Sequence, residues 1–165
     1  MACVEVTDAD REELREFIIA HWFDERIMSC GAVHVPHREQ GLLLRRDGRI
    51  VAALTYEMTA QGMEVLTLNS VLEGQGIGSM LMLSAIETAR RAECGRIWLT
   101  TSNDNLKAVS FYQRLGFRIV GVNLDAVDEE RTMNPRIPTH GERGVRMRDE
   151  LVLELILEPY LDPST

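Results

Sequence analysis

Three glycines, Gly74, Gly76 and Gly78, lie where an apolar run typical of a strand gives way to one typical of a helix. Such a turn leaves consecutive backbone N–H groups free at a helix N-terminus. These donors, with the positive end of the helix dipole, form an anion site whose usual occupant is phosphate. We expect glycine here because a side chain would keep a diphosphate away from the backbone.

The glycine turn matches neither of the two common nucleotide motifs. The dinucleotide motif G-x-G-x-x-G requires a third glycine, and the corresponding positions hold Ser79 and Leu81. Its acidic residue should end a second strand, whereas Glu93 precedes that strand. The P-loop requires a Lys, and the turn has none. The turn therefore predicts a phosphorylated ligand other than NAD or ATP. Taken by itself, the turn could equally be a tight connection between strand and helix that binds no ligand.

The charge of the chain bears on its partners. With 26 acidic and 18 basic residues, the formal net charge is −8. This charge argues against binding to nucleic acid and to an anionic membrane surface. The acidic residues concentrate in segments 8–16, 125–130 and 149–158. Such a surface would favour a cationic acceptor such as an amine, with simple solubility as the alternative interpretation.

Cysteine and histidine usage bears on compartment and metal binding. The three cysteines are odd in number and form no C-x-x-C motif, which predicts free thiols in a reducing cytosol. Acidic residues interrupt the first segment, so we expect no signal peptide and a cytoplasmic protein. His34 and His37 have no third ligand at a useful spacing, so we expect no metal site.

The elements that must position the turn fit one domain, residues 1–165, of the α/β class. Alternating or continuous apolar runs predict strands at 3–6, 42–45, 49–56, 64–71, 96–101, 117–124 and 150–158. Helical spacing predicts helices at 8–22, 76–94, 106–115 and 126–133. The strand–helix–strand unit around the glycine turn implies a parallel pair, with the turn at its carboxyl edge.

Three connections complete the predicted organisation. Asp47 and Gly48 form a strong two-residue hairpin signal between two strands. Segment 24–40 shows no clear pattern. The connection before the last strand is long and contains prolines and glycines, so we expect a lid or a disordered loop there.

A second motif follows the glycine turn. The pattern N-x-x-A-x-x-F-Y-x-x-x-G-F runs from Asn105 to Phe117, and together with the turn GQGIG it resembles the GNAT superfamily of acyl-CoA-dependent N-acetyltransferases. The carboxyl-terminal part is similar to a bacterial branch of unassigned substrate. The resemblance implies a three-layer fold: a twisted, mixed, mostly antiparallel sheet with helices on both faces, splayed between strands 64–71 and 96–101.

The resemblance also implies roles for individual residues. Acetyl-CoA would be the co-substrate, held along the strand end, the glycine turn and the following helix. The implied cofactor-binding residues are Asn69, Val71, Gly74, Gln75, Gly76, Ile77, Gly78, Ser79, Asn105 and Phe111. Tyr112 would protonate the departing thiolate, and Glu64 would act as general base through a water. For Phe111 and Tyr112 the alternative is core packing.

Other assignments stay open at this stage. Asp149, Glu150 and His140 are alternative bases, and Glu64 could simply begin an exposed strand. Glu73 stands where the family usually has Arg or Gln, and its carboxylate would repel a diphosphate unless it points away. The acceptor would be a small-molecule or protein amine, and the superfamily often forms homodimers. The alternatives are an acyl-CoA-binding sensor or structural protein without turnover, and a nucleotide-dependent enzyme.

Overall fold

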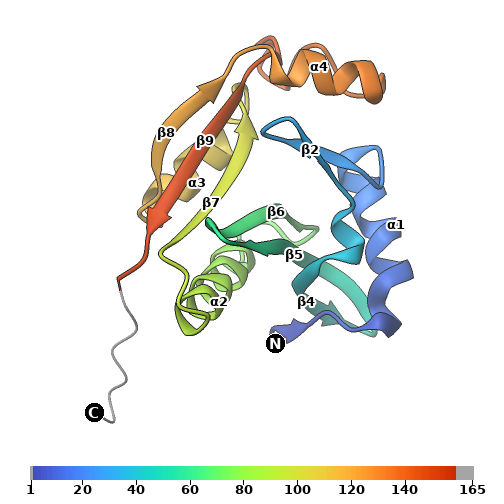
Figure 1. Ribbon diagram of the computed structural model, residues 1–165. Coiled ribbons are helices and arrows are strands. Elements are labelled where there is room, and N and C mark those ends of the chain that lie inside the picture. Colours follow the sequence, from blue (N-terminus) through green and yellow to red (C-terminus); the bar gives the residue numbers. More distant parts are fainter. Residues whose placement is uncertain (1, 159–165) are drawn as a thin grey trace.

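The computed structural model describes residues 2–158, which form one sheet with helices packed on it (Figure 1). Seven strands run in the order β1-β4-β5-β6-β7-β9-β8. They are β1 (Val4–Glu5), β4 (Gln40–Arg46), β5 (Arg49–Thr59), β6 (Gly62–Ser70), β7 (Arg96–Ser102), β8 (Arg118–Asn123) and β9 (Glu150–Ile156). β6 and β7 pair in parallel and the other neighbours are antiparallel. Each strand predicted from the sequence is confirmed.

Helices cover both faces of the sheet, as the predicted fold class requires. They are α1 (Arg11–Trp22), α2 (Ile77–Arg91), α3 (Leu106–Arg114) and α4 (Ala126–Met133), with short 3-10 helices at Asp8–Asp10 and Pro36–Arg38. Leu14 and Ile18 of α1 pack in one buried cluster with Leu43 of β4. The buried face of α2 belongs to a second, larger cluster that includes Leu42 and Leu44. Alternate residues of β4 therefore face different helices, which makes three layers.

The hairpin predicted at Asp47 and Gly48 joins β4 to β5. Both residues have positive φ angles, 52° and 79°, as a two-residue turn of type I′ requires. β5 lies inside the sheet between β4 and β6, which explains its nearly continuous apolar run.

The sheet opens between β6 and β7. The two strands pair only over three residues, from Met63 opposite Ile97 to Val65 opposite Leu99. Beyond Val65, β6 follows β5 with a bulge, whereas β7 follows β9 (Figure 1). The predicted splay is therefore present, and it separates the carboxyl ends of two central strands.

Segment 24–40, which had no clear pattern, contains a small hairpin. β2 (Ile27–Ser29) pairs with β3 (Ala32–His34) through a turn in which Cys30 and Gly31 have positive φ angles. Strands of three residues are too short to show alternation, which is why the sequence did not predict them.

The long connection before β9 has a defined path. It begins with α4, as predicted, and then forms an isolated bridge between His140 and Arg146. None of the helices in the described part of the chain combines the length and apolar character needed to cross a bilayer.

Candidate active site

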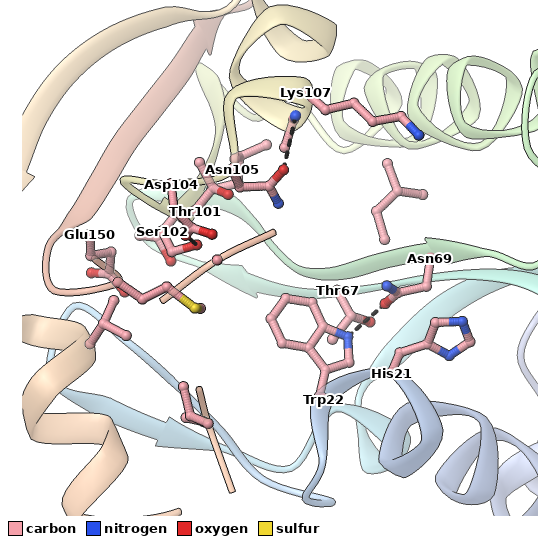
Figure 2. A pocket seen from close by; sticks show the side chains of 18 of the residues that line it. His21, Trp22, Thr67, Asn69, Thr101, Ser102, Asp104, Asn105, Lys107 and Glu150 are labelled. Carbon is pink, nitrogen blue, oxygen red and sulfur yellow. Dashed lines mark hydrogen bonds between the residues drawn. The ribbon is translucent and has the colours of Figure 1, made fainter. Parts of the chain in front are cut away.

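A cavity of about 810 Å³ occupies the opening between β6 and β7. Its walls come from residues 65–69 of β6, residues 99–102 of β7 and the first turns of α3. The loop after α4 covers it with residues 137–143 and Met147. Figure 2 shows polar side chains from both strands pointing into this space. Of the residues predicted to act in catalysis or binding, Asn69, Asn105 and Tyr112 line the cavity.

The glycine turn lies outside the cavity lining, at the start of α2. Gly74 and Gly76 have φ angles of 71° and 70°, and added Cβ atoms there would meet nothing within 4 Å. The positive φ angles give a conformational reason for glycine at these two positions, beside the clearance for a ligand expected from the sequence. The first bond of α2 runs from the Met80 amide to the Gly76 carbonyl at 3.0 Å. The amides of residues 77–79 are thus left for a ligand.

Phe111 connects the turn to α3. A Cβ atom added to Gly78 would lie 3.5 Å from Cζ of Phe111, so the ring lies against the first turn of α2. Val71, by contrast, is exposed, and its amide donates to the Val51 carbonyl at 2.9 Å. Phe111 is thus placed beside the predicted phosphate turn, while the side chain of Val71 points to solvent.

Asn69 and Trp22 face each other across the cavity mouth (Figure 2). The indole Nε1 of Trp22 donates to Oδ1 of Asn69 at 2.6 Å. Both residues line the cavity. Sequence analysis did not single out Trp22, because it continues the apolar stripe of α1. Trp22 is the last residue of α1, and this position at the helix end distinguishes it from the core residues earlier in the same stripe.

Asn105 is the N-cap of α3. Its Oδ1 accepts from the Ala108 amide at 3.1 Å, which satisfies one of the free donors of the first turn. The side chain also lines the cavity, so its NH₂ group is available to a ligand or a water.

Tyr112 is both a core residue and a cavity residue. Its ring packs edge-on against Phe111 and Phe117, at centroid distances of 5.0 Å and 5.6 Å. It belongs to the larger buried cluster and also lines the cavity. Burial raises the pKa of the phenol well above its ordinary value. Tyr112 therefore stays protonated at physiological pH and can donate a proton.

Glu64 is buried beside the cavity rather than in its lining as the structure describes it. The Ser29 hydroxyl donates to its Oε1 at 2.6 Å. The Ser29 and Thr100 hydroxyl oxygens are 3.1 Å apart, and Thr100 does line the cavity. Burial raises the pKa of Glu64, and the Ser29 hydrogen bond opposes that shift. The Glu64 carboxylate thus lies two hydroxyl groups away from the cavity.

His34 belongs to this cluster, and His37 does not. Nδ1 of His34 lies 3.2 Å from Oε2 of Glu57, and Nε2 lies 4.0 Å from Oε2 of Glu64. One ring nitrogen of His34 and one carboxylate oxygen each of Glu57 and Glu64 lie within 4.8 Å of one another, a grouping that could hold a metal ion. Sequence spacing missed this grouping because Glu57 and Glu64 lie on β5 and β6 of the sheet, whereas His34 lies on β3 of the separate β2–β3 hairpin.

Two further carboxylates line the side of the cavity near β2. Glu130 Oε1 accepts from the Met28 amide at 3.1 Å, and burial raises the Glu130 pKa. Glu150 Oε1 accepts from the Cys30 amide at 3.1 Å and from Asn123 Nδ2 at 2.7 Å. Their hydrogen-bond partners are amides rather than cations. This part of the cavity therefore presents two carboxyl groups that are paired with no cation among the described residues.

The remaining candidate bases differ in position. Asp149 accepts from the Asp125 amide at 2.9 Å and is not among the residues that line the cavity in the described part of the chain. His140 lines the cavity but is exposed. Of the four bases considered from the sequence, Glu64 and Glu150 are the buried ones.

The loop over the cavity is held by Arg131 of α4. Its guanidinium donates to the carbonyls of Ile137, Pro138 and Met147 at 3.1, 2.8 and 2.7 Å. The same group is paired with Asp128. The sequence predicted either a lid or a disordered loop here, and the structure shows a cover whose carbonyls are held by the mostly buried Arg131 side chain.

Comparisons with known proteins agree with this geometry. Residues 4–117 match the model of the acetyltransferase (GNAT) family. The chain is 32% identical over 146 residues to the uncharacterized protein YdhI of Bacillus subtilis (strain 168), covering 88% of this chain and 91% of that one. It is 40% identical over 50 residues to a streptothricin acetyltransferase of Streptomyces lavendulae, covering 30% of this chain and 26% of that protein.

A solved structure shows the same fold. It is the crystal structure of a GNAT family acetyltransferase from Elizabethkingia anophelis with acetyl-CoA bound. The TM-score is 0.68 at 16% identity, over 94% of this chain and 97% of that one. The motif resemblance and the predicted fold are confirmed: the chain belongs to the acetyltransferase (GNAT) family.

Proposed function

We propose that the protein transfers an acetyl group from acetyl-CoA directly to a primary amine, without a covalent enzyme intermediate. The observation that carries the proposal is the position of Tyr112. Its buried, protonated phenol lines the cavity between the splayed strands and lies next to Phe111, which in turn lies against the glycine turn. A thiolate formed in that cavity has a proton donor beside it.

The co-substrate is acetyl-CoA, which is also bound in the related crystal structure. The amides of the turn, residues 74–79, bind its diphosphate at the N-terminus of α2. The pantetheine arm pairs with the free edge of the chain from Asn69 to Val71, through backbone groups other than the Val71 amide, which donates to Val51. Asn105 and Phe111 contact the arm from α3. The support is positional: the strand edge and the start of α3 line one cavity, and Phe111 of α3 lies against the turn.

Tyr112 is the general acid and Glu64 the general base. The amine attacks the thioester carbonyl, the N–C bond forms, and the C–S bond breaks as Tyr112 protonates the sulfur. Glu64 accepts a proton from the acceptor through an intermediate carrier, since its carboxylate does not line the cavity within the described residues. Glu150 is the second candidate, because it is buried and faces the cavity directly.

The acceptor is a cationic amine. Glu130 and Glu150 present carboxylates whose partners are amides, and a buried anion is stabilised by a cation. A small-molecule amine suits the cavity better than a protein chain, because the loop held by Arg131 covers it. The relative from Streptomyces lavendulae is named for a small-molecule acceptor, streptothricin.

We place the protein in the cytoplasm as a homodimer. Cys3, Cys30 and Cys94 are free thiols, which suits a reducing compartment. Ile119, Val120 and Val122 of β8 are about half exposed on the last strand of the sheet. An apolar edge strand of this kind is suited to pairing with a second copy.

The test is a screen for CoA thiol release at saturating acetyl-CoA, with mono-, di- and polyamines as acceptors. We expect turnover with at least one cationic amine and an acetylated product of the matching mass. Stabilisation by acetyl-CoA without turnover on any amine would instead support the sensor alternative. That alternative is not favoured, because the family and the paired acid and base candidates both indicate an enzyme.

A further inference from the structure

We propose that a chain of five polar side chains carries the acceptor's proton from the cavity to solvent. From the cavity outward, these side chains are Thr100, Ser29, Glu64, His34 and Glu57. The inference rests on the proposed function and adds a route to it: the buried base exchanges its proton with water through the imidazole of His34.

The inner half of the route is a continuous run of hydrogen bonds. Thr100 lines the cavity, its Oγ1 lies 3.1 Å from Oγ of Ser29, and Ser29 donates to Glu64 at 2.6 Å. A hydroxyl both donates and accepts, so a proton given to Thr100 allows Thr100 to pass its own proton to Ser29. Ser29 in turn passes its proton to Glu64. The two hydroxyls thus connect the acceptor amine to a carboxylate that it does not touch.

The outer half of the route passes through His34. The Glu64 carboxylate is 6% exposed, so a proton that it holds needs a way out before the next turnover. His34 lies between that buried carboxylate and Glu57, whose side chain is 39% exposed. Its Nδ1 is 3.2 Å from Glu57, and its Nε2 is buried without a hydrogen-bond partner in the described structure. An imidazole that faces two carboxylates can accept a proton on one nitrogen and release one from the other.

The distance between His34 Nε2 and Glu64 Oε2 is 4.0 Å, longer than a hydrogen bond. A swing of the carboxyl group or one bridging water closes this gap. The other titratable groups near Glu64 are Cys30 on the turn of the β2–β3 hairpin and Glu150 on β9. The Glu150 carboxylate disfavours additional negative charge on Glu64, whereas burial raises the pKa of the Cys30 thiol, which stays neutral.

The proton balance of the route is simple. An acceptor that arrives as an ammonium ion loses one proton through the chain and becomes the neutral nucleophile. After attack, the N–C bond forms, the C–S bond breaks, and Tyr112 gives its proton to the sulfur. Tyr112 recovers a proton from the nitrogen of the collapsing intermediate. Each turnover therefore sends one proton to solvent, and Glu57 releases it.

The main test compares His34→Ala with the wild type. We expect kcat to fall about tenfold or more, since acid–base groups contribute larger factors still, with the Kd for acetyl-CoA unchanged. The loss should be greatest at low pH, where more of the acceptor arrives protonated. Added imidazole should restore part of the rate to His34→Ala and none to the wild type. Wild-type kcat and an unchanged pH profile in His34→Ala would overturn the proposal.

Two further variants keep the test decisive if His34→Ala folds poorly. Ser29→Ala interrupts the inner half and should show the same acid-dependent loss, without rescue by imidazole. Glu57→Gln interrupts the exit, and Glu87→Gln on the exposed face of α2 is its matched control. We expect a reduced rate in Glu57→Gln alone, and equal rates in these two variants would contradict the exit through Glu57.

The outcomes separate this route from the proposed function and from a metal site. If the wild type acetylates no amine, the proposed function fails. If it is active and the His34 and Ser29 variants match it, only the route fails. The three ligating side chains could also hold a cation. Stoichiometric metal in the purified protein, or loss of activity with EDTA that Zn²⁺ restores, would identify a metal site and overturn the route.

Discussion

Lys107 Nζ lies 3.4 Å from Oε1 of Glu73, so the carboxylate that seemed to oppose a diphosphate is paired with a cation from α3. Both side chains are 79% exposed and both line the cavity mouth. Because the pair is exposed, its effect on stability is small. Its effect on binding of the acetyl-CoA diphosphate is larger than its effect on stability, since Glu73 competes with the phosphates for the positive charge of Lys107.

This relationship predicts the effect of Glu73→Gln. Removal of the carboxylate frees Lys107, so we expect acetyl-CoA to bind a few-fold more tightly at low ionic strength, with the gain lost at high salt. Lys107→Met should weaken binding by a similar factor. Isothermal titration with acetyl-CoA at two salt concentrations measures both effects. Equal Kd values for wild type and Glu73→Gln at low salt would contradict the prediction.

The acid role of Tyr112 predicts a loss of rate without a loss of binding. Tyr112→Phe keeps the ring contacts with Phe111 and Phe117 but removes the proton donor, so kcat should fall about 10²-fold or more. The Kd for acetyl-CoA should stay within about twofold of wild type. Pre-steady-state thiol release and titration with acetyl-CoA measure the two quantities. A fully active variant would remove Tyr112 from the mechanism.

The raised pKa of Tyr112 also predicts the alkaline limb of the rate profile. The native phenol keeps its proton as pH rises through 10, the ordinary value for tyrosine, because burial disfavours the tyrosinate. The rate for a weakly basic amine should therefore show no fall near pH 10 while the protein stays folded. A decline centred at that pH, together with tyrosinate absorbance, would contradict the assignment.

Glu130 predicts a trade between stability and acceptor binding. Burial raises the pKa of Glu130 in the folded protein above its value in the unfolded chain. The folded protein therefore loses stability as pH rises above the unfolded-state pKa, because Glu130 must then be charged in a partly buried position. Glu130→Gln keeps the acceptor atom for the Met28 amide and removes the charge. We expect a higher melting temperature than wild type at pH 7.5, with the difference vanishing near pH 4.

The same variant should bind the acceptor less tightly. KM for a cationic amine should rise about tenfold in Glu130→Gln, while the Kd for acetyl-CoA stays unchanged. Glu129→Gln, at the adjacent exposed position of α4, is the matched control for both measurements. Equal effects of the two substitutions would show that the half-buried position of Glu130 at the cavity has no special role.

Local chemistry predicted much of this fold. Gly74, Gly76 and the Asp47–Gly48 hairpin carry their conformational signals within a few residues, and each turn was found where the sequence placed it. The cavity lining was predicted in part, since Asn69, Asn105 and Tyr112 were named beforehand. The positive φ angles of Gly74 and Gly76 add a second reason for glycine that the sequence did not indicate, and clearance for a diphosphate stays a prediction.

What the sequence missed depends on contacts between distant strands. His34, Glu57 and Glu64 have no local pattern in common, and they meet only because β3, β5 and β6 converge. Trp22 has the spacing of a core residue, yet its indole nitrogen reaches Asn69 because α1 ends at the opening of the sheet. Spacing along the chain cannot identify such residues, since their contacts depend on how the β2–β3 hairpin and α1 pack against the sheet.

Arg131 predicts how the cover over the cavity responds to mutation. It donates to three carbonyls of the loop and is mostly buried, so Arg131→Met leaves those acceptors without their donor and should cost about 2 kcal/mol of stability. Amide hydrogen exchange should rise in residues 137–147 and stay unchanged in α2. We expect KM for the acceptor to rise more than the Kd for acetyl-CoA, because the loop covers the acceptor side. Arg136→Met, an exposed Arg just after α4, is the control, and equal exchange in the two variants would contradict the role given to Arg131.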